Sequence, residues 1–219
     1  MSLWAIIPVK PLNRAKSRLA EVLSPEKRFD FAVMLLRRTL TTLAQVPQIT
    51  GTLVVSRDPK ALAIARELGA KTVQEGGPGE LNMALTRATE VVRIWHGTAV
   101  LILPADLPFI RVEDISAIAE LGRQGKTVVI ATDHEEDGTN ALLVRPAGMI
   151  PYTYGVKSYE YHSIAAKLAD AELKIYESEN VKLDIDVPED LDEYNRLVLD
   201  FHDDLLIPVI PDMTDLKTP

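Results

Sequence analysis

The chain has 219 residues, of which 47% are hydrophobic and 26% charged, and it carries a formal net charge of −8. This composition is typical of a soluble globular domain, and the acidic balance disfavours nucleic acid or an anionic membrane as a partner, because either would be repelled. The chain has no cysteine, which excludes disulfides, thiolate zinc sites and a cysteine nucleophile. It also has no membrane-length apolar stretch and no signal-peptide pattern, so we expect a cytoplasmic protein with no membrane partner.

Strand and helix patterns alternate along the chain. We expect strands at 3–9, 51–56, 71–74, 98–103, 127–131, 140–144 and 173–176, and helices from about 24 to 46, 59 to 69, 81 to 95, 112 to 124, 158 to 171 and 188 to 199. This alternation predicts a three-layer, Rossmann-like α/β fold with a mostly parallel central sheet. We assign 1–200 to one domain. The tail at 201–219 is either an arm on a partner subunit, as in a homodimer, or loosely ordered.

Ligands of such sheets bind beyond the carboxyl ends of the strands, which selects the loops 10–19, 75–82, 104–108 and 133–139. The first of these contains four cations within nine residues, namely Lys10, Arg14, Lys16 and Arg18. Cations of this kind suit a triphosphate and offset charge that builds up in a transition state. The alternative is a solvated charged loop. The position after the first strand favours phosphate binding.

The second loop is rich in glycine, including Gly79, and leads to Asn82. Glycine lets backbone N–H groups approach a base or ribose closely, and the Asn82 amide can both donate and accept hydrogen bonds. Taken alone, the pattern favours an ordinary connecting loop.

Two aspartates are candidate metal ligands. Asp106 follows an apolar strand within a proline-flanked turn, and Asp186 directly precedes the helix expected from Pro188. Mg²⁺ is usually held by one or two carboxylates together with phosphate oxygens and water. The alternative for Asp106 is a structural role in a turn or as a helix cap. For Asp186, helix capping and metal binding are equally supported. In a strand, Asp184 and Asp186 would share one face.

A possible anion pocket combines Thr139, at the mouth of a strand, with Gly155 and Ser158, which precede a helix whose N-terminal amides suit a phosphate or carboxylate. Each of these residues individually is better explained as part of a turn or as an N-cap. His162 belongs to none of the zinc-binding or Ser/His/Asp motifs, so a hydrolase built on histidine is unsupported.

Seven short motifs, taken in order, together resemble the guanylyltransferase family of coenzyme F420 biosynthesis, which uses 2-phospho-L-lactate or phosphoenolpyruvate. The motifs are Pro8-Val9-Lys10, Lys16-Ser17-Arg18-Leu19, Leu81-Asn82, Pro104-Ala105-Asp106-Leu107-Pro108, Gly138-Thr139-Asn140-Ala141-Leu142, Gly155 with Ser158, and Asp186 with Pro188-Glu189-Asp190-Leu191.

This resemblance implies a nucleotidyltransferase fold, GTP as the donor, a small phosphorylated acid as the acceptor and Mg²⁺ as the cofactor. It also implies roles for individual residues: metal binding by Asp106 and Asp186, catalysis by these two with Lys16, nucleotide contacts from Lys10, Lys16, Arg18, Gly79 and Asn82, and acceptor contacts from Thr139, Gly155 and Ser158. One departure is the absence of the Gly-x-Gly loop after the first strand, which leaves the triphosphate more dependent on cationic side chains.

Other functions share parts of this pattern. A sugar-1-phosphate or molybdenum-cofactor nucleotidyltransferase would have the same fold, and a nucleotide-sugar glycosyltransferase would share the layered plan but usually carries Asp-x-Asp after a central strand. A non-catalytic nucleotide-binding module would bind GTP without releasing pyrophosphate.

Overall fold

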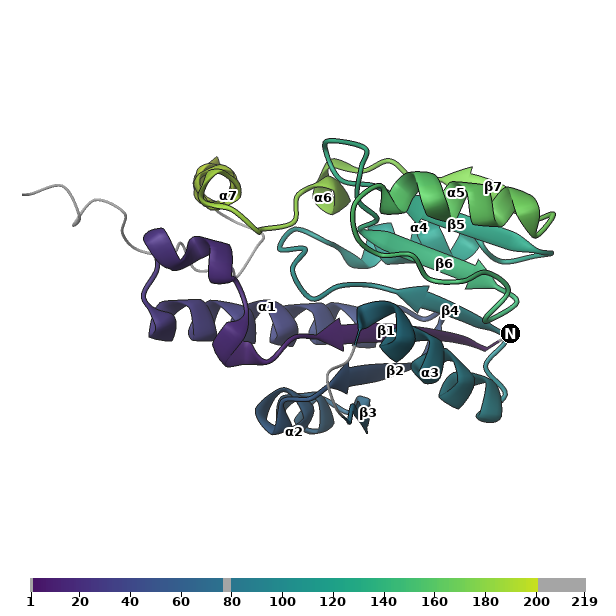
Figure 1. The fold of residues 1–219 in the computed structure, drawn as a ribbon, viewed down its shortest axis with the longest axis horizontal. Helices are drawn as coiled ribbons and strands as arrows, with labels where there is room; N and C mark the ends of the chain where they lie inside the picture. The colour runs from purple at the N-terminus through teal and green to yellow at the C-terminus, as the bar shows by residue number, and fades with distance from the viewer. Residues whose placement is uncertain (1, 77–79, 201–219) are drawn as a thin grey trace, which may run out of the picture.

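The computed structural model describes residues 2–76 and 80–200, and at its centre is a seven-stranded sheet in the order β3-β2-β1-β4-β6-β5-β7 (Figure 1). The strands are β1 (Leu3–Val9), β2 (Ile49–Ser56), β3 (Lys71–Gln74), β4 (Ala99–Ile102), β5 (Thr127–Ala131), β6 (Ala141–Arg145) and β7 (Glu172–Ile175). The predicted nucleotide contact Gly79 and the predicted tail at 201–219 lie outside the described residues.

The helices begin largely where the capping patterns predict. They are α1 (Pro25–Ala44), α2 (Pro59–Glu67), α3 (Leu81–Ile94), α4 (Val112–Leu121), α5 (Ser158–Leu168), the short α6 (Glu179–Lys182) and α7 (Pro188–Asp200). The Ser24 and Asp58 side chains accept hydrogen bonds from the first-turn amides of α1 and α2, each followed by a proline at the first helical position. Within the described ranges no helix combines the length and apolar character needed to cross a membrane.

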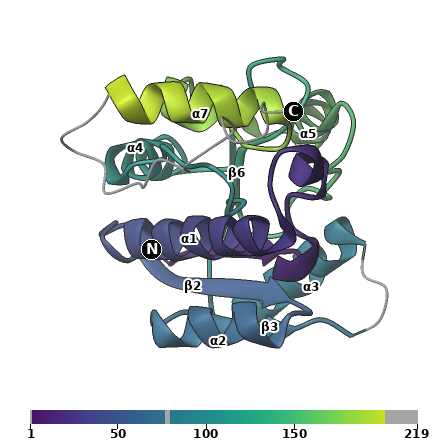
Figure 2. The ribbon, with the colours of Figure 1, turned by 90° about the vertical axis from the view of Figure 1, so that its left-hand side faces the viewer.

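The sheet is covered on both faces, as the alternation predicts (Figures 1 and 2). Successive side chains of a strand point to opposite faces, so Leu3, Ala5 and Ile7 of β1 pack in one core with α1, α2 and α4, whereas Ile6 packs in the other with α3 and α5. Both cores are therefore continuous across the sheet, and the loops beyond the carboxyl ends of the strands rest on a rigid base.

The strand β6 is the exception to the parallel arrangement. It runs antiparallel between β4 and β5, because the segment 132–140 is too short to contain a crossover helix. The sheet is thus mostly parallel, as predicted. As a further consequence, the start of β6 lies at the same edge as the ends of β1, β4 and β5, which brings Thr139 and Asn140 to the ligand-binding edge.

The cationic loop after β1 is more ordered than a solvated loop. It contains two short 3-10 helices, η1 (Leu12–Arg14) and η2 (Ser17–Glu21). Leu19 of η2 belongs to a third apolar cluster, which joins η2 and α1 to the α6–α7 segment through Phe31, Leu183, Ile185 and Tyr194. This cluster attaches the last helix of the described chain to the loop after the first strand.

We predict that Tyr194→Ala will destabilise the attachment of α7. Tyr194 is fully buried, and its ring centroid lies 5.6 Å from the rings of both Phe31 and Phe109. Removing an aromatic side chain from such a site costs about 3–5 kcal/mol of unfolding free energy, measurable by chemical denaturation. The control Tyr161→Ala, at a side chain that is 50% exposed, should cost far less, and equal losses for the two variants would contradict this account.

Candidate active site

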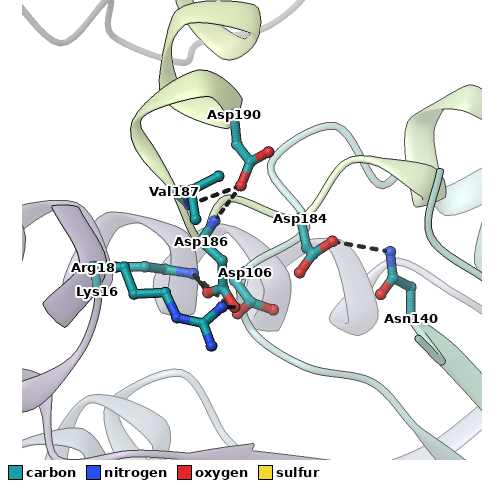
Figure 3. Close-up of polar contacts among 8 residues, drawn as sticks. All are labelled: Lys16, Arg18, Asp106, Asn140, Asp184, Asp186, Val187 and Asp190. Atoms are coloured by element: carbon teal, nitrogen blue, oxygen red, sulfur yellow. Dashed lines mark hydrogen bonds and ion pairs between the residues drawn. The ribbon is translucent and has the colours of Figure 1, made fainter. Parts of the chain in front are cut away.

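Three segments that are far apart in the sequence meet at the carboxyl edge of the sheet. Lys16 follows β1, Asp106 follows β4, and Asp186 lies between α6 and α7 (Figure 3). Lys16 is in the left-handed region, with a φ of 54°, a conformation uncommon for a residue with a side chain and often found at functional sites. The backbone carbonyl of Asp106 accepts a hydrogen bond from the Ile185 amide at 3.4 Å, which ties the two acidic segments together.

The Lys16 ammonium lies between the two predicted metal-ligand carboxylates. Its Nζ is 3.0 Å from Asp106 Oδ2 and 3.4 Å from Asp186 Oδ1, and the lysine side chain is only 6% exposed. The Arg18 guanidinium is 3.9 Å from Asp186 Oδ2 and 70% exposed. The structure therefore brings the predicted catalytic residues Lys16, Asp106 and Asp186 into one cluster, with Arg18 at its solvent-exposed side.

Charge balance decides the protonation state of Lys16. Burial acts to lower its pKa, but the attraction of Asp106, Asp186 and Asp184 outweighs burial, so that the net effect is a raised pKa. Lys16 is thus a fixed cation at neutral pH. In this state it supplies positive charge to the cluster and does not act as a base.

Asp184 is a third carboxylate facing this cluster. Burial, followed by repulsion from Asp106 and Asp186, raises its pKa to about 6. Its Oδ1 lies 3.5 Å from Asn140 Nδ2, which also donates to the carbonyls of Val181 and Lys182. In the sequence the only signal for Asp184 is its alternate spacing with Asp186. The two residues lie in a connection between helices and not in a strand.

The start of α7 is bound by an acid of the helix itself. The Asp190 carboxylate accepts hydrogen bonds from the amides of Asp186 and Val187, at 2.7 and 2.8 Å, as an acid in the first turn of a helix does. The Asp186 carboxylate itself contacts Lys16 and Arg18. This arrangement leaves the carboxylate directed into the cluster.

The predicted anion pocket forms a second cluster. Thr139 and Ser158 are both buried, and Ser158 Oγ donates to Thr139 Oγ1 at 3.2 Å. Both are linked to His162, whose Nδ1 is 3.0 Å from Thr139 Oγ1. Burial lowers the pKa of His162 to about 4, so the ring is neutral at pH 7. The sequence motifs test His162 only as a zinc ligand or a catalyst, and its position one turn into α5 after Ser158 was the signal that could have found this role.

The backbone around Gly155 is held by side chains from other elements. Asn82, at the start of α3, donates through Nδ2 to the Tyr154 carbonyl at 3.1 Å and accepts through Oδ1 from the Tyr154 amide at 2.8 Å. Much of the hydrogen-bonding capacity that suggested a nucleotide contact for Asn82 is therefore used within the protein. Gly155 has a φ of 135°, which favours glycine. Lys10, another predicted nucleotide contact, is exposed immediately after β1.

The donor set around Lys16 fits a magnesium ion that is held partly by substrate. Within the described residues no group of three or more His, Asp or Glu side chains is arranged to hold a metal alone. Asp106 and Asp186, however, are partly exposed carboxylates that both contact the Lys16 ammonium and so lie close to each other. Mg²⁺ commonly binds through one or two carboxylates, with phosphate oxygens and water completing its octahedron.

The fold is that of the nucleotidyltransferases. Solved structures with the same fold include the 4-diphosphocytidyl-2C-methyl-D-erythritol synthase of Anaerococcus prevotii (TM-score 0.62, 15% identity, covering 90% of this chain and 96% of that one). A nucleotidyl transferase from Methanothermobacter is similarly close (TM-score 0.62, 14% identity, covering 91% and 99%).

Within this class the chain belongs to the family described as guanylyl transferase CofC like, whose model matches residues 3–199. The phosphoenolpyruvate guanylyltransferase of Rubrobacter xylanophilus is 41% identical over 191 residues, which cover 87% of this chain and 92% of that protein. The 2-phospho-L-lactate guanylyltransferase of Methanocaldococcus infernus is 35% identical over 188 residues, covering 86% and 82%.

We predict that Lys16→Met will destabilise the protein in metal-free buffer, because three carboxylates would then face one another without the ammonium. The expected loss is about 2 kcal/mol, below that of a fully buried pair because the carboxylates are partly exposed. Adding Asp184→Asn should recover part of the loss, and Lys126→Met, at an exposed lysine, is the control. Chemical denaturation in EDTA measures five proteins: the wild type, Lys16→Met, Asp184→Asn, the double variant and the control. Strictly additive effects of Lys16→Met and Asp184→Asn would show that the two residues are not coupled.

Proposed function

We propose that this protein is a Mg²⁺-dependent guanylyltransferase that transfers GMP from GTP to the phosphate of a three-carbon phospho-acid, phosphoenolpyruvate or 2-phospho-L-lactate, and releases pyrophosphate. The observation that carries the proposal is the convergence of Lys16, Asp106 and Asp186 at the carboxyl edge of a nucleotidyltransferase sheet. Membership of the family and the names of its relatives support the base and the acceptor class. The reaction would serve coenzyme F420 biosynthesis, as the resemblance implies.

Charge balance supports the requirement for a divalent cation. The cluster contains the carboxylates Asp106, Asp184 and Asp186 against the cations Lys16 and Arg18, and GTP would add several negative charges. Asp106 and Asp186 would hold Mg²⁺, which when bound neutralises charge on the polyphosphate and on the leaving pyrophosphate.

The chain's own residues bind and orient the reactants. A phosphate oxygen of the acceptor attacks the α-phosphorus of GTP, forming a new P–O bond while the bond from the α-phosphorus to the bridging oxygen of pyrophosphate breaks. Because the second pKa of a phosphate monoester is about 6, the nucleophile is already largely ionised at neutral pH and needs no general base. Lys16 and Arg18 reduce the repulsion between the two anions and stabilise the developing charge.

The acceptor would bind beside Thr139, Gly155 and Ser158. Within the described part of the chain, the backbone N–H groups of Thr139 and Gly155 donate no hydrogen bond to the protein. Gly155 is exposed, but Thr139 is only 6% exposed, and the amides of buried residues are almost always paired. Two unpaired amides suit a carboxylate, the group that distinguishes a phospho-acid from a sugar phosphate. They support the assignment of this pocket to the acid end of the acceptor.

A pyrophosphate-release assay tests the proposal. The protein is supplied with GTP and Mg²⁺ and, in turn, with phosphoenolpyruvate, 2-phospho-L-lactate, a sugar 1-phosphate and molybdopterin. Release with a three-carbon phospho-acid and its loss in EDTA are expected. Release only with one of the other acceptors would assign the chain to a rival nucleotidyltransferase class, and GTP binding without release would indicate a non-catalytic module.

We predict that Asp106→Asn will reduce turnover by about 10²- to 10³-fold, because it removes a charge that positions the cation on the reacting phosphates. Turnover is measured by pyrophosphate release, and circular dichroism verifies the fold. Asp192→Asn, at an exposed position on α7, is the matched control and should retain full activity. Near-normal activity of Asp106→Asn would remove this residue from the mechanism.

We predict that Gly155→Ala will raise the KM for the phospho-acid while leaving the KM for GTP nearly unchanged. An alanine Cβ has open space there, but the φ of 135° is unfavourable for it, so the backbone and the Gly155 N–H would move. Gly69→Ala is a matched control, because Gly69 also has a positive φ of 81° and open space but lies after α2. The same change in acceptor KM for both variants would show that strain alone, and not the pocket, is responsible.

A further inference from the structure

The buried ring of His162 contacts both segments that carry the unpaired amides of the acceptor pocket. Its Nδ1 lies 3.0 Å from Thr139 Oγ1, and its Nε2 accepts a hydrogen bond from the Thr153 amide, also at 3.0 Å. Thr139 belongs to the loop between β5 and β6, and Thr153 lies two residues before Gly155. The imidazole therefore spans the distance between these two segments.

These contacts determine the tautomer of the ring. The Thr153 amide can only donate, so Nε2 must carry a lone pair, and a neutral ring then carries its proton on Nδ1. The Nδ1–H donates to Thr139 Oγ1, and burial keeps the pKa of the imidazole near 4. Protonation of Nε2 would break the bond to Thr153.

The hydrogen count around Thr139 has a further consequence. Three hydrogens are available, one on His162 Nδ1 and one on each hydroxyl of Thr139 and Ser158. The Nδ1–H donates to Thr139, and the Ser158 hydroxyl also donates to Thr139. The hydroxyl hydrogen of Thr139 is therefore left for another partner. With the opposite tautomer both hydroxyl hydrogens would be consumed, and the pair would have none to offer an anion.

The ring is also held from the side. The rings of Tyr154 and His162 pack edge to face, with centroids 4.9 Å apart, and the Tyr154 backbone is bound by Asn82. Rotation of the imidazole would therefore disturb this packing as well as both hydrogen bonds.

We infer that His162 is a positioning residue for the acceptor: it holds the Thr139 and Thr153–Gly155 segments at a fixed separation and leaves a hydrogen-bond donor directed at the acid. It acts through Thr139 and the Thr153 backbone and is not assigned a catalytic role. The inference rests on the proposed function, because it assigns His162 to the binding of the same phospho-acid.

The test uses three substitutions in the full chain. His162→Phe retains a ring but removes both hydrogen bonds, and it should raise the KM for phosphoenolpyruvate or 2-phospho-L-lactate about tenfold, with the KM for GTP changed by less than about twofold. His162→Asn places an amide N–H near the position of Nδ1 and should recover part of this loss. Ala166→Gly, at a buried position of the same helix, should lower stability without changing the acceptor KM.

An unchanged acceptor KM in His162→Phe, or an equal rise in Ala166→Gly, would overturn the inference. A second measurement does not depend on activity: ¹H–¹⁵N NMR of the wild-type imidazole at pH 7 should show a protonated Nδ1 and an unprotonated Nε2, and the opposite tautomer or an imidazolium would overturn it. If the wild-type protein released no pyrophosphate with any phospho-acid, the proposed function would fail, whereas the NMR result would still decide whether His162 links the two segments.

Discussion

The structure depends on one buried ammonium group that joins carboxylates from distant parts of the chain. Asp106 and Asp186 lie 90 and 170 residues after Lys16 in the sequence, and the three meet only because α7 folds back over the loop after β1. The apolar cluster around Tyr194 makes this return possible, since it packs the α6–α7 segment against α1 and η2. Packing energy far from the ligand thus sets the geometry of the charged groups.

This arrangement explains how an acidic protein can bind a polyanion. The net charge of −8 would repel GTP, but Lys16 and Arg18 supply local positive charge at the edge of the sheet, to which the proposed Mg²⁺ would add. Thr139, Gly155 and His162 carry no charge themselves and offer hydrogen-bond donors instead. Separate charged and neutral subsites would let the protein bind a triphosphate and a small acid without placing both anions against the same cations.

Much of the fold could be predicted from the sequence, because apolar strands, capping residues and prolines are local signals. The antiparallel direction of β6 was not predicted, although the short connection at 132–140, which has no room for a crossover helix, was a local signal for it. The meeting of Lys16 and Asp106 followed from the rule that loops at the carboxyl ends of strands meet. Asp186 lies between α6 and α7, outside the loops that this rule selects, and its place in the cluster was implied by the family resemblance. The pairing of Asn82 with the Tyr154 backbone is a contact between distant segments that no local pattern indicates. For the links made by His162, the position of this residue one turn after Ser158 was the only local signal.

The most direct test of the account is a crystal structure with Mn²⁺ in place of Mg²⁺ and a GTP analogue that has a methylene group between the α- and β-phosphates, with the metal located by anomalous scattering. The account predicts one metal peak bound by Asp106 and Asp186, with the triphosphate in contact with Lys16 and Arg18. It would be contradicted if the nucleotide lay elsewhere, for example in the cavity lined by Phe29, Arg57 and Lys60, while Lys16 kept its contacts with both carboxylates and no metal bound there.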